Sequence, residues 1–296
     1  MKLFEIVNGN QRTRKISEED FVDILEHHCA QSVININFTP IYRGINTTAF
    51  GKQLQLKVGD STVGAPRVSK NTKNYYTLWV DNSKEWKDFP KRSRSFICST
   101  SRTDAEYFGK AYLVIPYDNA QIGICPESDY WYSFDIIDDL SSLNSLIDNI
   151  SSIFLDLEIG DMDINDMDPS DFDFLFSFLE TINVKNLKVA ANALESKITS
   201  ATIKKQINYI REAELLLSQN NVNDFTEVME KVLSPKHFKK STGASFNETR
   251  EVECFIGGKA LFMPLNFSGA EQYEILKKYL DDNDLNNILS LFKKKY

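Results

Sequence analysis

Two glutamates near the C-terminus have a spacing that could do acid-base or charge-stabilising chemistry. Glu251 and Glu253 are two positions apart in the β-like segment 251–256. Residues two apart in a strand point to the same face, so the pattern predicts paired carboxylates, with Val252 and Cys254 entering the core. A solvent-exposed strand face is the alternative reading of the same pattern.

A run of hydroxyl side chains closes a second β-like segment. Ser99, Thr100 and Ser101 follow a stretch that is apolar as far as Cys98. The spacing places the hydroxyl groups of Ser99 and Ser101 on one side of the strand, where they could bind a ligand or position a carboxylate. A polar strand end, or a cap for a helix that begins near Thr103, is the simpler interpretation.

Arg43 lies between Tyr42 and Gly44 at the end of a short predicted strand. A guanidinium group offers a fork of donors that matches a phosphate, and a neighbouring glycine would let a ligand approach the backbone. The alternative is a surface arginine. Each of these three motifs is weak alone, but their order along the chain and their shared β setting add weight.

A strand arginine, a strand Ser-Thr-Ser and a strand Glu-x-Glu, in this order, resemble the Arg-Ser-Glu family of mono-ADP-ribosyltransferases. In that family the Glu-x-Glu strand continues as an apolar run, a glycine-containing turn and another strand, which is similar to residues 251–262. The resemblance covers about residues 33–132 and 245–265, and its character is similar to transferases carried by tailed bacteriophages. It implies an α+β fold with a split, mostly antiparallel β core that clasps NAD.

The resemblance also implies a reaction, in which ADP-ribose passes from NAD to a protein acceptor and nicotinamide is released. NAD would be the substrate, and no metal would be needed. Glu253 would bind the nicotinamide ribose and stabilise the oxocarbenium-like cation, while Glu251 would orient or deprotonate the acceptor. Because the first acid of the pair is a glutamate, the implied acceptor is an arginine, on a host protein if the chain is phage-encoded.

The resemblance implies roles for the other two motifs as well. Arg43, with Gly44 beside it, would hold the NAD phosphates. Ser99 would position the ribose and Glu253, and Thr100 and Ser101 would support the site through hydrogen bonds.

One departure from the family concerns spacing, because Ser101 and Glu253 are 152 positions apart (253 minus 101). Between about 133 and 240 the apolar residues change to helical spacing, which predicts an inserted helical subdomain. A long insertion at a surface loop costs little closure entropy. We therefore expect three segments: residues 1–132 and 246–296 form the transferase core, and residues 133–245 form the insert.

A rival acidic pair, Glu127 and Asp129, has a more familiar distance from Ser101. We favour Glu251 and Glu253 because aspartate is shorter and Pro126 disfavours an ordered central strand.

The pattern of apolar residues and turn signals predicts the elements that must position these motifs. Helices are expected over about 17–31, within 71–92 and ending before Pro90, and over 103–108. A further helix should start at Asp168-Pro169 in the insert, with closing helices from residue 268. Strands are expected over 32–38, 40–44, 95–99, 111–115 and 121–125. Residues 251–256 and 259–264 are expected to form a hairpin that turns at Gly257-Gly258.

Composition argues against several other classes of protein. The net charge of −8 disfavours nucleic acid and anionic lipid as partners, and no apolar run reaches the ~20 residues of a membrane span. A cytoplasmic protein is expected. The four cysteines are far apart without metal-ligand spacing, so we interpret them as reduced, buried thiols rather than a zinc site.

Two other functions stay open at this point. The first is a non-catalytic interaction protein, virion-associated, on a decayed transferase-like core, although retention of all three motifs argues against decay. The second is an enzyme that hydrolyses NAD with water as acceptor. A basic region has two interpretations, a binding surface for phosphate or an acidic partner and a solvated face. It comprises Lys84, Lys87, Lys91, Arg92, Arg94 and Arg102.

Overall fold

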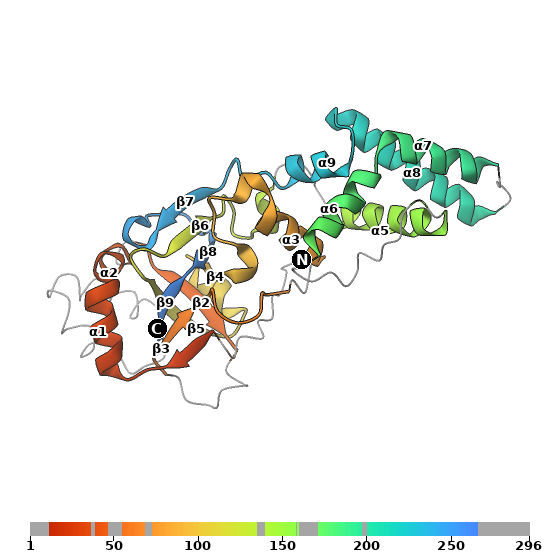
Figure 1. Cartoon of the computed structure of the whole chain (residues 1–296). Coiled ribbons are helices and arrows are strands. Elements are labelled where there is room, and N and C mark those ends of the chain that lie inside the picture. The colour runs from red at the N-terminus through yellow and green to blue at the C-terminus, as the bar shows by residue number, and fades with distance from the viewer. Residues whose placement is uncertain are drawn as a thin grey trace. The chain divides into compact units, whose positions relative to one another are not determined.

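The computed structural model describes residues 12–36, 39–46, 55–68, 73–134, 140–157, 159, 171–196 and 200–265. These residues form two compact units (Figure 1). The β unit contains the described residues of 12–67, 88–133 and 237–265, and the helical unit contains those of 68–87 and 134–236. Helices are combined with an antiparallel sheet, so the chain is an α+β protein.

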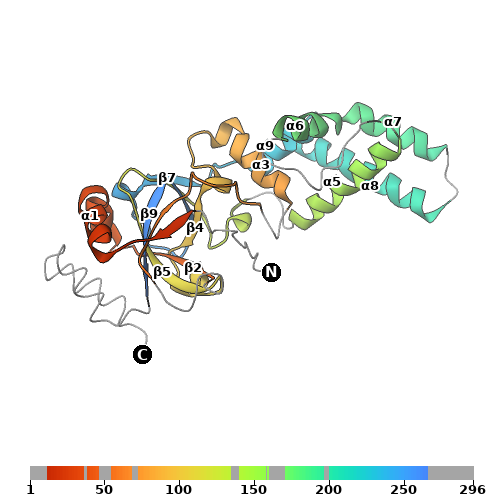
Figure 2. The ribbon, with the colours of Figure 1, turned by 60° about the horizontal axis from the view of Figure 1, so that its bottom comes forward.

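The β unit is built on one antiparallel sheet of nine described strands. In sheet order they are β1-β3-β9-β5-β2-β4-β8-β6-β7. Neighbours in this order are hydrogen-bonded, and β5 and β2 can be seen side by side in Figure 2. The bounds are β1 (Thr13–Lys15), β2 (Ile41–Ile45), β3 (Lys57–Asp60), β4 (Phe96–Ser99), β5 (Lys110–Pro116), β6 (Gln121–Ile124), β7 (Lys239–Thr242), β8 (Glu253–Gly257) and β9 (Lys259–Pro264).

The sheet is nearly divided between β2 and β4. These two strands share one residue pair, Tyr42 with Ser99. By contrast, β2 pairs with β5 through five residues, and β4 pairs with β8 through four. The sheet therefore consists of two ribbons, β1-β3-β9-β5-β2 and β4-β8-β6-β7, that meet at a single pair.

The predicted hairpin of residues 251–264 is wrong, although both of its strands exist. β8 lies between β4 and β6, whereas β9 lies between β3 and β5, so the two strands do not pair with each other. The chain switches from one ribbon to the other at Gly258, whose φ is +111°. A glycine pair predicts a sharp change of direction, but the sequence does not reveal that each strand has two other neighbours.

The first predicted helix is confirmed as α1 (Glu18–His28). Ser17 caps it, since the Asp20 backbone N–H donates to the Ser17 hydroxyl at 3.0 Å. Phe21 and Leu25 are buried on its inner face. The helix thus begins and packs as its sequence predicts.

The predicted strand 32–38 is wrong, because residues 30–36 form helix α2 (Ala30–Ile36). Asp118 caps this helix from far along the chain, accepting from the backbone N–H of Gln31 at 3.3 Å and of Ser32 at 2.8 Å. Val33 and Ile36, which are buried, fit a helix as well as a strand. A distant carboxylate decides the conformation here, and local pattern cannot show it.

Four predicted strands and one helix of the β unit are confirmed. They are β2, β4, β5 and β6, together with α4 (Arg102–Glu106). Three further strands, β1, β3 and β7, were not predicted. They have three or four residues each, and the two outermost strands, β1 and β7, are mostly polar and exposed, so only their partners β3 and β6 define them.

The helical unit contains α3 (Asn74–Asn82), α5 (Leu140–Asp156), α6 (Phe172–Thr181), α7 (Val184–Glu195), α8 (Ala201–Asn220) and α9 (Phe225–Val232). The helix expected within 71–92 is shorter than predicted, because α3 ends at Asn82 and a single 3-10 turn, Lys84–Trp86, follows. The indole N–H of Trp86 donates to the Leu233 carbonyl at 2.6 Å, which ties this segment to the unit. Tyr75, Tyr76 and Trp79 are buried, so these aromatics are core residues.

Two predicted features lie outside the described residues. They are the helix start at Asp168-Pro169 and the closing helices from residue 268. Among the residues that are described, no helix is both long and apolar enough to cross a membrane.

The switch between ribbons at Gly258 gives a first prediction. The nearest atoms to an added Cβ are those of Ala120 at 3.8 Å, so a methyl group fits and only the backbone conformation opposes it. We expect Gly258→Ala to lower the free energy of unfolding by about 1–3 kcal/mol. Urea unfolding should show Lys259→Ala, its exposed neighbour, within about 0.5 kcal/mol of wild type. Equal stability of the two variants would contradict this account of the bend.

Candidate functional site

The three motifs lie on three consecutive strands of the sheet. Arg43 is in β2, Ser99 ends β4, and Glu253 begins β8. Tyr42 is the register partner of Ser99, and Ser99 is the register partner of Glu253. Ser99 and Glu253, which are 154 positions apart in sequence (253 minus 99), are thus joined by one ladder of residue pairs.

Glu253 is held in a buried ion pair that the sequence analysis did not foresee. Its carboxylate accepts from Arg92 Nη1 at 2.9 Å and from the Tyr130 backbone N–H at 3.3 Å. The side chains of Arg92 and Glu253 are only 3% and 14% exposed. The Arg92 guanidinium also lies over the Tyr130 ring, 3.7 Å from its centroid. Arg92 was assigned only to a basic region, because nothing in the sequence connects it to residue 253.

The electrostatics of Glu253 reflect two opposing effects. Burial raises the pKa of Glu253, while the Arg92 guanidinium acts to lower it. The net direction is upward, so desolvation is the larger effect. A carboxylate in this setting depends on Arg92 to remain ionised.

Glu251 is not on a strand, which corrects the expectation of two carboxylates on one strand face. β8 begins at Glu253, and Glu251 is exposed in the segment before it. Thr100 holds this segment from β4: its hydroxyl accepts from the Val252 N–H at 2.8 Å and donates to the Arg250 carbonyl at 2.7 Å. The Thr100 backbone N–H also donates to the Val252 carbonyl at 3.0 Å, so pairing with the β4 segment continues to Val252, and Glu251 lies just beyond it.

The two serines of the motif mainly hydrogen-bond to nearby backbone. The Ser99 hydroxyl accepts a hydrogen bond from the Ser101 N–H at 3.0 Å and donates one to the Val252 carbonyl at 3.4 Å. Ser101 is the N-cap of α4, accepting from the Asp104 N–H at 3.4 Å. Ser99 therefore lies directly opposite Glu253, whereas Ser101 has the helix-capping role that was the alternative interpretation.

Arg43 is close in the sheet but not on the same face. Alternation along the strands places Ser99 and Glu253 on one face, and Arg43 with Cys98 on the other. The Arg43 guanidinium donates to the Ile97 carbonyl, and burial lowers its pKa. The structure thus brings Ser99 and Glu253 together and leaves Arg43 beside them, where β2 and β4 stop pairing.

Gly44 serves packing rather than ligand access. A Cβ at this position would lie 2.0 Å from the Ala105 carbonyl oxygen, because α4 packs directly on β2. The expectation that a ligand approaches the backbone at Gly44 is therefore wrong, since a helix occupies that space.

The rival pair, Glu127 and Asp129, lies outside the strands in the segment that follows β6. Glu127 is exposed, and its backbone carbonyl accepts from the Glu253 N–H at 3.1 Å. Asp129 accepts from the Trp131 N–H at 2.8 Å. This segment supports β8 from one side but does not present two carboxylates on a strand face.

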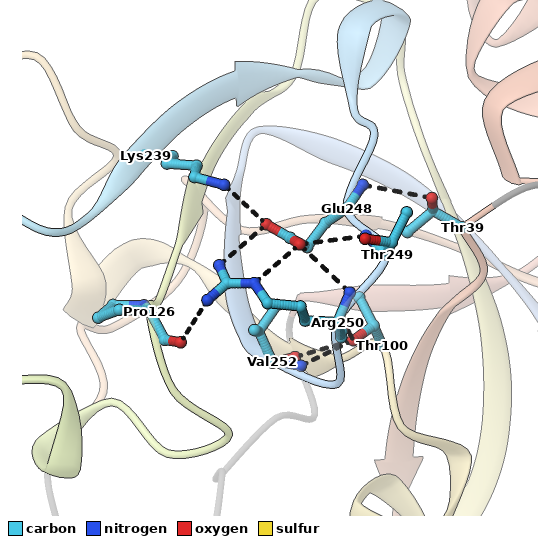
Figure 3. Close-up of polar contacts among 8 residues, drawn as sticks. All are labelled: Thr39, Thr100, Pro126, Lys239, Glu248, Thr249, Arg250 and Val252. Atoms are coloured by element: carbon cyan, nitrogen blue, oxygen red, sulfur yellow. Dashed lines mark hydrogen bonds and ion pairs between the residues drawn. The ribbon is translucent and has the colours of Figure 1, made fainter.

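A second buried carboxylate, Glu248, organises the loop that leads into β8 (Figure 3). It accepts from Lys239 Nζ at 3.1 Å and from Arg250 Nε and Nη2 at 3.1 and 3.2 Å. It also accepts from the backbone N–H groups of Thr249 and Arg250. Arg250 in turn donates to the Pro126 carbonyl at 3.1 Å, which links the loop to the segment after β6.

The four cysteines are free and buried, as predicted, and burial raises the pKa of Cys98 to about 12. In the described part of the chain, no group of three or more His, Cys, Asp or Glu side chains could hold a metal ion. Comparisons of the whole chain find no matching family model, no matching curated protein and no matching solved structure.

The Glu248 cluster predicts a defined acid response. The hydrogen bonds from the Arg250 side chain, with those from Lys239 and the Arg250 backbone, lower the pKa of Glu248 from 4.5 to about 2. Because the folded-state pKa is lower than the unfolded one, its contribution is complete above pH 4.5 and is lost as the pH falls toward 2. We expect Glu248→Gln to lower unfolding free energy by about 1–3 kcal/mol at pH 7.

Urea unfolding at pH 7 and pH 3 tests this, and the difference between wild type and Glu248→Gln should shrink at the lower pH. The matched control is Glu251→Gln, an exposed carboxylate in the same loop, for which we expect a change within about 0.5 kcal/mol. A difference that is the same at both pH values would exclude the ionised Glu248 as its cause.

The buried pair predicts strong coupling between Arg92 and Glu253. Arg92→Met alone should cost about 3–5 kcal/mol near pH 8, because it leaves a buried carboxylate uncompensated. Since the folded-state pKa of Glu253 is raised, this deficit should shrink as acid protonates the carboxyl group. Adding Glu253→Gln should restore most of the loss. Additive effects in this double-mutant cycle would show that the two side chains do not depend on each other.

Proposed function

We propose that the chain is a mono-ADP-ribosyltransferase that transfers ADP-ribose from NAD to a protein acceptor, with arginine as the acceptor residue. One observation carries the proposal: the strands bearing Arg43, Ser99 and Glu253 are consecutive in a split antiparallel sheet. The residues were singled out from sequence alone, across a long insertion. Their adjacency in the sheet supports the resemblance to the Arg-Ser-Glu transferases, with Ser99 and Glu253 on one face and Arg43 beside them on the other.

The environments of the two glutamates support different roles for them. Glu253 is buried and opposite Ser99, so its negative charge would act at low dielectric on a ribose cation formed when the nicotinamide bond breaks. Glu251 is exposed two residues earlier, where it would orient or deprotonate an incoming acceptor. Two carboxyl groups of different environment can divide the work of a single reaction.

Arg92 adds a requirement to this mechanism. A carboxylate that stabilises a cation must be ionised, and the buried Glu253 is kept so by the Arg92 guanidinium. Arg43 lacks a carboxylate partner among the described residues, and its guanidinium donates to the Ile97 carbonyl. In the proposed complex, the NAD phosphates would provide the negative charge that pairs with Arg43. Thr100 would hold the Glu251 segment in place through its bonds to Arg250 and Val252.

The Arg92–Glu253 pair also supports a second candidate. A carboxylate already neutralised by a buried arginine is typical of a structural ion pair. On that reading the chain is a non-catalytic interaction protein built on a transferase-like core. A third outcome, hydrolysis of NAD by water, uses the same residues without an acceptor.

The test is incubation of the purified chain with labelled NAD and a cell lysate, following both label transfer and nicotinamide release. Glu253→Gln should reduce both by at least about 100-fold, the usual effect of removing one charge-stabilising group. Glu251→Gln should reduce transfer more than release. Lys204→Gln, an exposed change on α8, is the matched control and should behave as wild type.

Each outcome separates the candidates. Release without transfer in any lysate would favour the hydrolase. No turnover by wild type, or turnover that survives Glu253→Gln, would reject the transferase assignment in favour of the interaction protein.

A further inference from the structure

A second site lies at the opposite end of β4 and β8 from the candidate active site. It is a cleft of about 1060 Å³ within the β unit, lined by α1, by the turn between β5 and β6, by Pro90-Lys91, and by the bend at Gly257-Gly258. The pair Phe96–Ile256 at this end is three residue pairs from Ser99–Glu253, or about 10 Å along the ladder. The volume is that of a small-molecule site.

The cleft collects positive charge in a protein whose net charge is −8. Arg14, Lys91, Arg94 and Lys259 all line it. Arg94 donates to the carbonyls of Thr62 and Gly64, at 3.0 and 3.1 Å. Within the described chain, Arg14, Lys91 and Lys259 make no ion pair. Four cations brought together from separate segments repel one another unless an anion lies between them.

The two carboxylates of the cleft are already engaged. Asp118 accepts from the backbone N–H groups of Gln31 and Ser32. Asp60 accepts from the Thr62 N–H at 2.9 Å and from the Thr62 hydroxyl at 2.6 Å. Both acids keep their negative charge while they cap neighbouring backbone, so four cations and two carboxylates leave the lining with an excess of two positive charges (four minus two).

The Tyr117 ring, which lines the cleft, already has neighbours on it, and this favours recognition of a ligand by charge rather than by ring stacking. The Tyr117 ring is stacked on His28, with 5.1 Å between centroids and an interplanar angle of 5°. Lys259 Nζ lies 6.0 Å from the same ring. Because Tyr117 already contacts both groups, a ligand would meet ammonium and guanidinium donors instead of a vacant aromatic face.

We propose that this cleft binds a small ligand that carries several phosphate groups. Arg14, Arg94 and Lys259 supply charge-assisted donors from three different segments, and guanidinium and ammonium groups are the usual partners of phosphate oxygens. Gly257 and Gly258 also line the cleft, where they present backbone and no side chain.

The test is titration of the full chain with inorganic tripolyphosphate and, separately, with ATP, by isothermal calorimetry at fixed salt. We expect saturable binding of tripolyphosphate that the double variant Arg14→Gln/Lys259→Gln weakens at least about tenfold. Lys204→Gln, an exposed change on α8, should leave the affinity unchanged. Equal affinity for both probes would identify the phosphates as the recognised group, and tighter binding of ATP would identify a nucleotide.

Two results would overturn the proposal: no binding of either probe at millimolar concentration, or binding that the double variant retains. Thermal unfolding of the double variant without ligand distinguishes lost binding from lost folding. The outcome is independent of the transferase assay, because none of the varied cleft residues belongs to the candidate active site.

Discussion

The compensation of one buried charge, that of Glu253, is the constraint on which the β unit depends. A carboxylate removed from water is costly unless it is paired and hydrogen-bonded, and this one is satisfied by Arg92 and by the Tyr130 backbone. Arg92 precedes β4, and Tyr130 follows β6. The bonds to the Glu253 carboxylate therefore hold together the segment before β4, the start of β8 and the segment after β6. In the same arrangement Ser99 lies opposite Glu253.

The split in the sheet follows from how the strands are connected. β8 and β9 are consecutive in sequence yet belong to different ribbons, and Gly258 provides the backbone conformation for the change. Among the described residues, Tyr42 and Ser99 are the one register pair between the ribbons. Arg43, the next residue of β2, adds a side-chain bond to the Ile97 carbonyl of β4. The long helical insertion of residues 134–236 is compatible with this sheet, because the residues before and after the insertion both belong to the β unit.

Much of the fold could be predicted from the sequence where local pattern and tertiary context agree. The capping serine of α1 and the apolar runs of β2, β4, β5 and β6 behave as their residues indicate. The errors arise where residues far apart in sequence interact: Asp118 caps the helix of residues 30–36, the Thr100 side chain bonds the segment before β8, and α4 packs against Gly44. The order of the motifs in the sequence identified Ser99 and Glu253 as candidates. That these two residues are register partners, and that Arg92 forms an ion pair with Glu253, depends on strand pairing, which a local sequence pattern does not show.

The most direct test of the central claim is a crystal structure of the wild-type chain bound to a non-hydrolysable NAD analogue. The account predicts that the nicotinamide ribose contacts Ser99 and Glu253, that the Arg43 guanidinium reaches the phosphates, and that Arg92 stays within hydrogen-bonding distance of Glu253. An analogue bound elsewhere, or none bound beside an unchanged Arg92–Glu253 pair, would contradict the claim that these three strands form an NAD site.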